Sequence, residues 1–172
     1  MLSHIAILME NQPGALSRVV GLFSQRGYNI DSLSVAPTQD PTLSRLTMTT
    51  SENPEIINQI LRQLYKLVDV VMVQNLSDAE AYSIELAIIK LISSREKIEK
   101  IISQAKKLEG KILDDKDDHI MFEIWGDSAD IDALLASLKE EEFLEVTRSG
   151  LLGMTKGNVA LNTNDQTKIS YD

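Results

Sequence analysis

The sequence predicts an α+β fold made of two βαββαβ sandwiches that follow one another along the chain. Apolar residues recur with a helical period in four segments and form strand-like apolar or alternating runs in the segments between them. The order strand, helix, strand, strand, helix, strand occurs twice, and turn-forming residues separate most of these segments. Each half would therefore place two helices on one face of an antiparallel sheet.

The first half opens with a strand and an amphipathic helix. Leu2–Met9 is apolar and strand-like, and the helix is expected at Ala15–Arg26. Its apolar stripe, at i, i+3, i+4 and i+7, consists of Leu16, Val19, Val20 and Phe23. Pro13 suits the first turn of this helix, and Gly27 suits the position that ends it.

Two strands, a helix and a further strand complete the first half. The strands Asn29–Ala36 and Leu43–Thr50 flank a hairpin loop at Pro37–Pro41. Asn53 and Pro54 are typical of a helix N-cap and first helical position. The helix behind them buries isoleucine and leucine, and Lys66–Gln74 supplies a strand rich in valine.

The second half repeats this order after a short polar linker. Strands are expected at Tyr82–Ile92, Lys111–Asp114, Asp118–Trp125 and Phe143–Arg148. Ser93 to Glu96 matches a capping box for the first helix, and Asp127 or Ser128 caps the second. The acidic run from Asp114 to Asp118 lacks the spacing of a calcium loop and is interpreted as a solvated hairpin turn.

This order of elements predicts two ferredoxin-like sandwiches, and a polar tail follows the second one. We expect a first domain at residues 1–76, a linker at 77–81, a second domain at 82–156 and a polar tail at 157–172. The tail has too little apolar content to fold alone, so disorder is expected after about residue 158. The uncovered sheet faces and edges of such units favour self-association over a monomer with polar outer faces.

The amino-acid composition of the chain excludes several classes of function. The chain has 172 residues, no cysteine, 43% apolar residues and a formal net charge of −9. No apolar run approaches the length that spans a bilayer and no signal peptide is visible, so a cytoplasmic, non-membrane protein is expected. An acidic chain without a basic face is not suited to nucleic-acid binding, because such binding depends on neutralising the phosphates.

The sequence offers no catalytic or metal-binding constellation. His4 and His119 are the only histidines, and they lie in different domains. No Ser-His-Asp arrangement, zinc-binding histidine pair or phosphate-binding glycine loop occurs. We therefore expect no catalytic residue, no metal site and no cofactor in this chain.

A ligand site is instead predicted where the first helix begins. Pro13 and Gly14 open this helix, whose free backbone N–H groups suit a carboxylate. Asn11 and Asn29 flank the helix, and their amides suit the main-chain atoms of a free amino acid. Taken alone, Asn11 is slightly more typical of a loop residue than of a ligand, and Asn29 is also typical of a helix stop.

Several stretches resemble one known family. They are Gly14–Ile30 (Gly-Ala-Leu-Ser-Arg-Val-Val-Gly-Leu-Phe-Ser-Gln-Arg-Gly-Tyr-Asn-Ile), Asp40–Arg45, Leu64–Val70 and Thr147–Gly150. Together they resemble the bacterial small subunits of acetolactate synthase, also called acetohydroxyacid synthase, whose N-terminal unit is an ACT domain. The resemblance covers residues 1 to about 156 and is most specific in the first seventy.

This resemblance implies a regulatory role. The chain would have no catalytic site of its own, would form a homodimer through its ACT domains, and would bind a branched-chain amino acid, most often valine, at the dimer interface. It would also bind the large catalytic subunit, which carries thiamine diphosphate, Mg²⁺ and FAD and condenses pyruvate with pyruvate or 2-oxobutanoate. The small subunit would raise that activity and confer feedback inhibition.

The resemblance also implies which residues bind the effector. They are Asn11, Gly14, Ala15, Leu16, Asn29 and Ile30, with the last two reaching the effector from the neighbouring protomer. Arg18, Arg26, Arg45 and Arg148 are expected at the surface or against a partner. Two alternatives remain: a free-standing ACT-domain sensor that serves another enzyme or a transcription factor, and a small enzyme in its own right.

Overall fold

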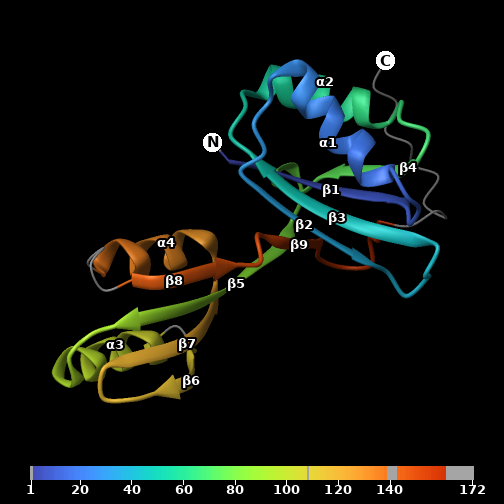
Figure 1. The fold of residues 1–172 in the computed structure, drawn as a ribbon. Helices are drawn as coiled ribbons and strands as arrows, with labels where there is room; N and C mark the ends of the chain where they lie inside the picture. Colours follow the sequence, from blue (N-terminus) through green and yellow to red (C-terminus); the bar gives the residue numbers. More distant parts are fainter. Residues whose placement is uncertain (1, 108, 139–142, 162–172) are drawn as a thin grey trace. The chain divides into compact units, whose positions relative to one another are not determined.

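The computed structural model describes residues 2–107, 109–138 and 143–161, and it divides into two units. The first unit combines the described parts of Met1–Tyr82 and Leu151–Asp172, and the second is Ser83–Gly150. In each unit two helices cover one face of an antiparallel sheet (Figure 1). The predicted α+β fold with two βαββαβ sandwiches is confirmed.

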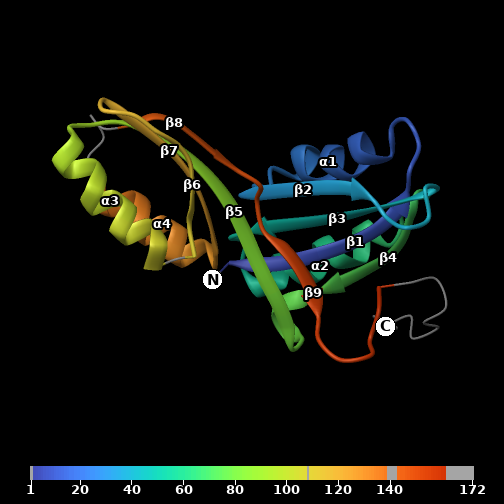
Figure 2. The same ribbon diagram turned by 90° about the horizontal axis from the view of Figure 1, so that it is seen from below.

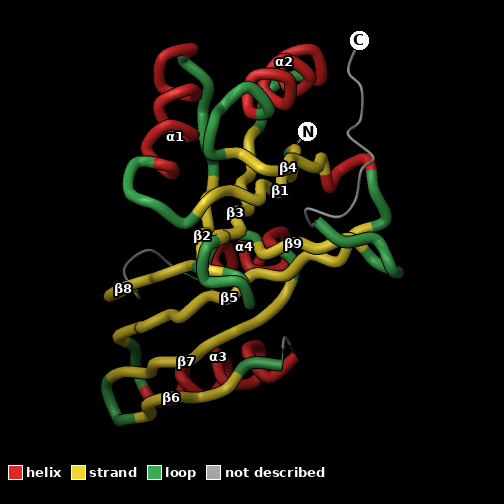
Figure 3. Tube along the Cα trace, turned by 90° about the vertical axis from the view of Figure 1, so that its right-hand side faces the viewer, coloured by secondary structure: helices red, strands yellow, loops and turns green. Residues whose placement is uncertain are grey.

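The first unit contains the strands β1 to β4, the helices α1 and α2 and two short additional elements. Their bounds are β1 (Ser3–Glu10), α1 (Ala15–Arg26), β2 (Ser32–Pro37), β3 (Leu43–Thr50), α2 (Pro54–Leu64), β4 (Val70–Asn75), a 3₁₀ helix η1 (Leu76–Asp78) and β9 (Leu152–Thr155). The strand order is β2-β3-β1-β4, so β2 and β4 form the edges of this sheet. Both helices lie on the same side of it (Figure 3).

Local sequence explains where these helices begin and end. α2 starts behind Asn53, whose side-chain oxygen accepts a 2.9 Å hydrogen bond from the Ile56 N–H. α1 ends at Gly27, which has a φ of +68° that glycine adopts without steric cost. The helix faces its sheet through Ala15, Val19 and Phe23, all buried and spaced four residues apart.

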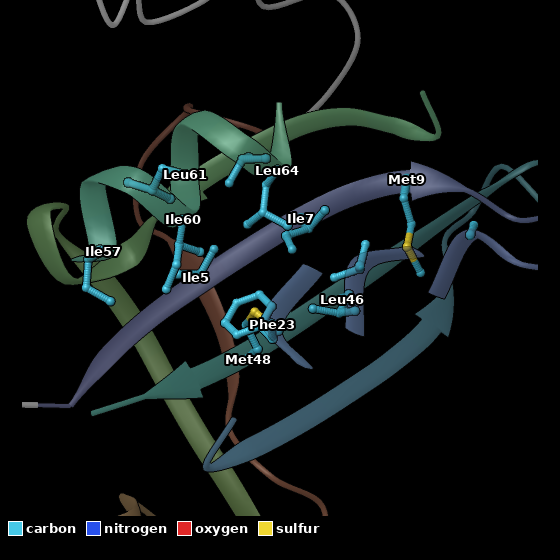
Figure 4. Packing of buried hydrophobic residues seen from close by; sticks show 13 residues of the cluster. Ile5, Ile7, Met9, Phe23, Leu46, Met48, Ile57, Ile60, Leu61 and Leu64 are labelled. Carbon is cyan, nitrogen blue, oxygen red and sulfur yellow. The ribbon is translucent and has the colours of Figure 1, made fainter. Parts of the chain in front are cut away.

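The core of the first unit lies between these helices and the sheet (Figure 4). Strand β1 contributes Ile5 and Ile7, and β3 contributes Leu46 and Met48, all with no solvent exposure. The other buried members of this cluster are Met9, Ala15, Val19, Phe23, Ile57, Ile60, Leu61, Leu64 and Val73. This packing fixes α1, and with it the predicted ligand site, against the centre of the sheet.

The opposite face of the first sheet is partly covered by η1 and β9. Ala6 and Leu8 alternate with the core residues of β1 and are nevertheless buried on this second face. A β-carbon at Gly153 would lie 2.6 Å from Leu76, so only glycine fits between β9 and η1. Arg45 donates a 2.7 Å hydrogen bond to the carbonyl of Gly153.

Strand β9 was not expected from the sequence and changes where the C-terminal segment belongs. It pairs with β5 next to Tyr82 (Figure 2). We expected residues 151–156 to close the second domain, but the structure groups them with the first unit. The reason is that β9 contacts β1 and η1 and covers a sheet face that would otherwise expose apolar side chains.

The second unit repeats the plan of the first. Its elements are β5 (Ala81–Ile92), α3 (Arg95–Lys107), β6 (Lys111–Asp115), β7 (His119–Gly126), α4 (Ser128–Ser137) and β8 (Phe143–Arg148). The strand order β6-β7-β5-β8 matches that of the first sheet, element for element. Buried Glu85 accepts two hydrogen bonds, of 2.8 and 2.7 Å, from the guanidinium of Arg148. Arg148 is thus held within its own unit and also reaches Asp132 at 2.6 Å.

Three local expectations need correction. Strand β2 begins at Ser32 rather than Asn29, because the side chain of Asn29 bonds to Asp31 in the loop after α1. The linker at 77–81 holds most of η1 rather than irregular chain. The N-cap of α3 is Ser94 and not Ser93, since the Ser94 carbonyl accepts the first helical N–H groups.

Only residues 157–161 of the expected polar tail are among the described residues. Residues 157–161 have no helix or strand, and the expected disorder beyond about residue 158 otherwise falls on 162–172, outside the described residues. No helix within the described ranges is long and apolar enough to cross a lipid bilayer.

Candidate functional site

The start of α1 forms an open group of backbone donors. Gly14 has a φ of +91°, which strains any residue with a β-carbon. The Ala15 N–H donates to the carbonyl of Gln12 at 3.2 Å. Among the described residues, the N–H groups of Gly14, Leu16 and Ser17 have no hydrogen-bond acceptor. The helix dipole favours an anion at this position, so a carboxylate fits here.

Asn11 lies beside this helix start and is held by the β2–β3 loop. Its backbone N–H donates to the carbonyl of Thr42 at 2.7 Å, and its side-chain Nδ2 donates to that of Pro41 at 2.9 Å. The side chain is exposed, and its oxygen stays available as an acceptor for an ammonium group. The predicted residues Asn11, Gly14, Ala15 and Leu16 thus lie together.

Asn29 and Ile30 lie at the other end of α1. The side-chain Nδ2 of Asn29 donates to Asp31 at 2.7 Å, and its backbone carbonyl accepts from the hydroxyl of Thr50 at 2.7 Å. A helix of 12 residues is about 18 Å long at 1.5 Å per residue. One amino acid therefore cannot contact Gly14 and Asn29 of the same chain.

An ion pair beneath the helix start was not predicted from the sequence. Arg18 donates from Nε to one oxygen of Asp69 and, at 2.7 Å, from Nη2 to the other. Gln12 adds a 2.6 Å hydrogen bond to the same carboxylate, and the Glu10 N–H donates to the Asp69 carbonyl at 2.8 Å. The Asp69 side chain is 1% exposed and that of Arg18 is 45% exposed.

This ion pair ties the ligand site to the sheet. The hydrogen bond from Arg18 is the largest effect on the Asp69 carboxyl and lowers its pKa, while Asp69 raises the pKa of Arg18. A β-carbon at Gly14 would lie 3.0 Å from Nη1 of Arg18, so the guanidinium borders the open helix start. The one sequence signal for this pair is an aspartate inside the apolar run Leu67–Val70.

The edge strand β2 runs alongside the helix that carries the site. Its neighbour in the described sheet is β3, so its other side has unpaired backbone groups. Leu33 and Val35 pair with core residues of β3 and so face the helix side of the sheet. Val35 is 39% exposed, and Val20 of α1 is 37% exposed. These valines leave apolar surface open along this side of the unit.

Two family models match the chain, and together they span most of it. Residues 5–72 match the ACT domain of acetohydroxyacid synthase small subunits, and residues 84–157 match the small subunit of acetolactate synthase. The isozyme 3 small subunit of acetolactate synthase from Salmonella typhimurium is 43% identical over 155 residues, which cover 90% of this chain and 95% of that protein. The chain belongs to the acetolactate synthase small subunit family.

Other members of the family agree in length and in structure. The acetolactate synthase small subunit of Haemophilus influenzae is 44% identical over 157 residues, 89% of this chain and 94% of its own length. The crystal structure of the acetolactate synthase small subunit from Thermotoga maritima superimposes with a TM-score of 0.82 at 31% identity. It covers 92% of this chain and 99% of the Thermotoga chain, so the two chains share both units in the same order.

Metal binding by the histidines or by the acidic run Asp114–Asp118 has no support among the described residues. No group of three or more histidine, aspartate or glutamate side chains there is arranged to hold a metal ion. His119 contacts Asp118 at 2.8 Å and Asp114 at 3.2 Å, so its imidazole links the two strands of the β6–β7 hairpin. The acidic run forms the turn of the β6–β7 hairpin, where the Lys116 N–H donates to the His119 carbonyl at 3.0 Å, as interpreted from the sequence.

Proposed function

We propose that this chain is the non-catalytic regulatory subunit of an acetolactate synthase and that it senses a branched-chain amino acid, with valine favoured. The observation that carries this proposal is the open start of α1, with unpaired N–H groups beside the amide of Asn11. Such a site suits the carboxylate and ammonium of a free amino acid. Family membership supplies the catalytic subunit as the partner.

The effector site is completed by a second copy of the chain. Two chains related by a twofold axis, with their α1 helices antiparallel, would bring Gly14 of one chain toward Asn29 of the other. The open edge of β2 and the exposed valines Val20 and Val35 suit such a contact. Ile30 is partly buried against the core and would line the apolar end of the site.

Regulation would follow from this shared site. An effector that contacts both chains links its own binding to the geometry of the dimer, and the dimer in turn touches the catalytic subunit. A coupling of about 1–3 kcal/mol between effector and catalytic subunit gives typical feedback effects. The thiamine diphosphate, Mg²⁺ and FAD of the reaction would all be bound by the catalytic subunit, so the isolated chain would not turn over pyruvate.

The variant Gly14→Asp tests the position of the site. It places a carboxylate within reach of Arg18, where the carboxylate of the effector would lie. Isothermal titration with valine should then show no saturable binding. Gly157→Asp is the matched control, because it changes another positive-φ glycine with open space around it. A Gly14→Asp chain that binds valine like the unmodified one would show that the site is elsewhere.

A further inference from the structure

A second feature of the first unit is a basic hollow between its two helices. It measures about 540 Å³ and is lined on the α1 side by residues three or four apart, from Gly14 to Arg26. Gln63, Lys66 and Leu67, from the end of α2 and the turn that follows it, form the opposite wall. Three cations line the hollow, namely Arg18, Arg26 and Lys66.

The charge of this hollow stands out from the rest of the chain. Arg18 is neutralised by Asp69, but Arg26 and Lys66 have no acidic side chain within 4 Å in the described part of the chain. The chain as a whole has a formal net charge of −9. Two uncompensated cations at a concave site attract an anionic group.

Gly21 gives independent support for an occupant. It lies in the middle of α1, where glycine is less favourable than any residue except proline. A β-carbon at this position would meet nothing within 4 Å, so packing within the chain does not require glycine. Gly21 lines the hollow, and its missing side chain lets another molecule approach the backbone of α1.

We propose that an acidic surface segment of the catalytic subunit docks in this hollow, with its carboxylates on Arg26 and Lys66 and its backbone against Gly21. The proposal rests on the regulatory function proposed above and adds the surface through which it acts. Gly14 and Arg18 border both the hollow and the effector site. Arg18 thus lies between the effector site and the docking hollow. A shift of its guanidinium on effector binding would therefore change the binding of the catalytic subunit, and the reverse.

The test measures activation of the catalytic subunit by charge-reversed chains. The double variant Arg26→Glu and Lys66→Glu should lower the apparent affinity for the catalytic subunit by about tenfold or more. Arg62→Glu is the matched control, because Arg62 is an exposed α2 cation outside the hollow, and its affinity should stay within about threefold of the unmodified chain. Gly21→Leu fills the hollow with a good helix former, and it should weaken activation without lowering the thermal unfolding midpoint.

Other measurements separate this proposal from its rivals. Isothermal titration with valine tests the effector site by itself, and the double variant should still bind valine. Unchanged activation by both the double variant and Gly21→Leu would overturn the docking proposal, even if inorganic phosphate binds in the hollow. Loss of self-association of the double variant in sedimentation would also overturn it, because a second copy would then occupy the hollow.

Discussion

The guanidinium of Arg18 binds the buried carboxylate of Asp69 through two hydrogen bonds, one from Nε and one of 2.7 Å from Nη2. The two residues are 51 positions apart and join α1 to the turn that precedes β4. Gln12 adds a third donor to the same carboxylate. The open start of α1 is therefore fixed by a charged network that reaches the sheet, and this preorganises it for a ligand.

Removing the cation of this pair should destabilise the first unit. Arg18→Met leaves the Asp69 carboxylate buried with Gln12 as its remaining side-chain donor, which is costly for a charged group. The thermal unfolding midpoint should fall by at least about 5 °C. Arg62→Met, at an exposed position, is the control and should leave the midpoint unchanged. Equal midpoints for the two variants would show that the pair adds nothing to stability.

The same pair predicts a specific acid dependence. The hydrogen bond from Arg18 is the main cause that lowers the pKa of Asp69 below its ordinary value of 3.8. The stability from this group is therefore present above pH 3.8 and is lost as the pH falls through the lowered folded-state pKa. Urea unfolding of the unmodified chain and of Asp69→Asn should give curves that converge as the pH falls below about 3. A constant difference between the curves down to the lowest pH would contradict the ion pair.

His119 should show the opposite dependence in the second unit. The hydrogen bond to Asp118, followed by that to Asp114, raises its pKa above the ordinary 6.5. Its contribution is present below pH 6.5 and is lost as the pH rises through the higher folded-state pKa. An NMR titration of the imidazole protons should place its pKa above 6.5, and Asp118→Asn should lower it. A His119 titration midpoint at or below pH 6.5 in the unmodified chain would contradict the hydrogen bonds to Asp118 and Asp114.

Much of the fold could be predicted because the signals are local. The N-cap Asn53, the positive-φ stop at Gly27 and the apolar period of α1 each depend on residues within a few positions. Strand β9 could not be predicted in this way. Its four residues acquire their role only from η1 and the sheet face that they cover, both of which lie some 70 or more positions away in sequence.

The candidate site was predictable only in part for the same reason. Gly14 and Asn11 are three positions apart in sequence and lie together in the structure. Arg18 and Asp69 form a pair only after the chain has folded, and no local pattern marks Asp69 as the partner of Arg18. Asn29 lies at the opposite end of α1, and a role in the same site requires a second chain.

A dimer with two different variant chains tests the shared effector site most directly. Chains carrying Gly14→Asp and chains carrying Asn29→Ala can be co-expressed with different affinity tags and purified as the mixed dimer. If the site combines Gly14 of one chain with Asn29 of the other, each variant homodimer has no intact site and the mixed dimer has one. Isothermal titration with valine should then give about one site per mixed dimer, against two for the unmodified dimer and none for either variant homodimer. No binding by the mixed dimer would contradict a site shared between two chains.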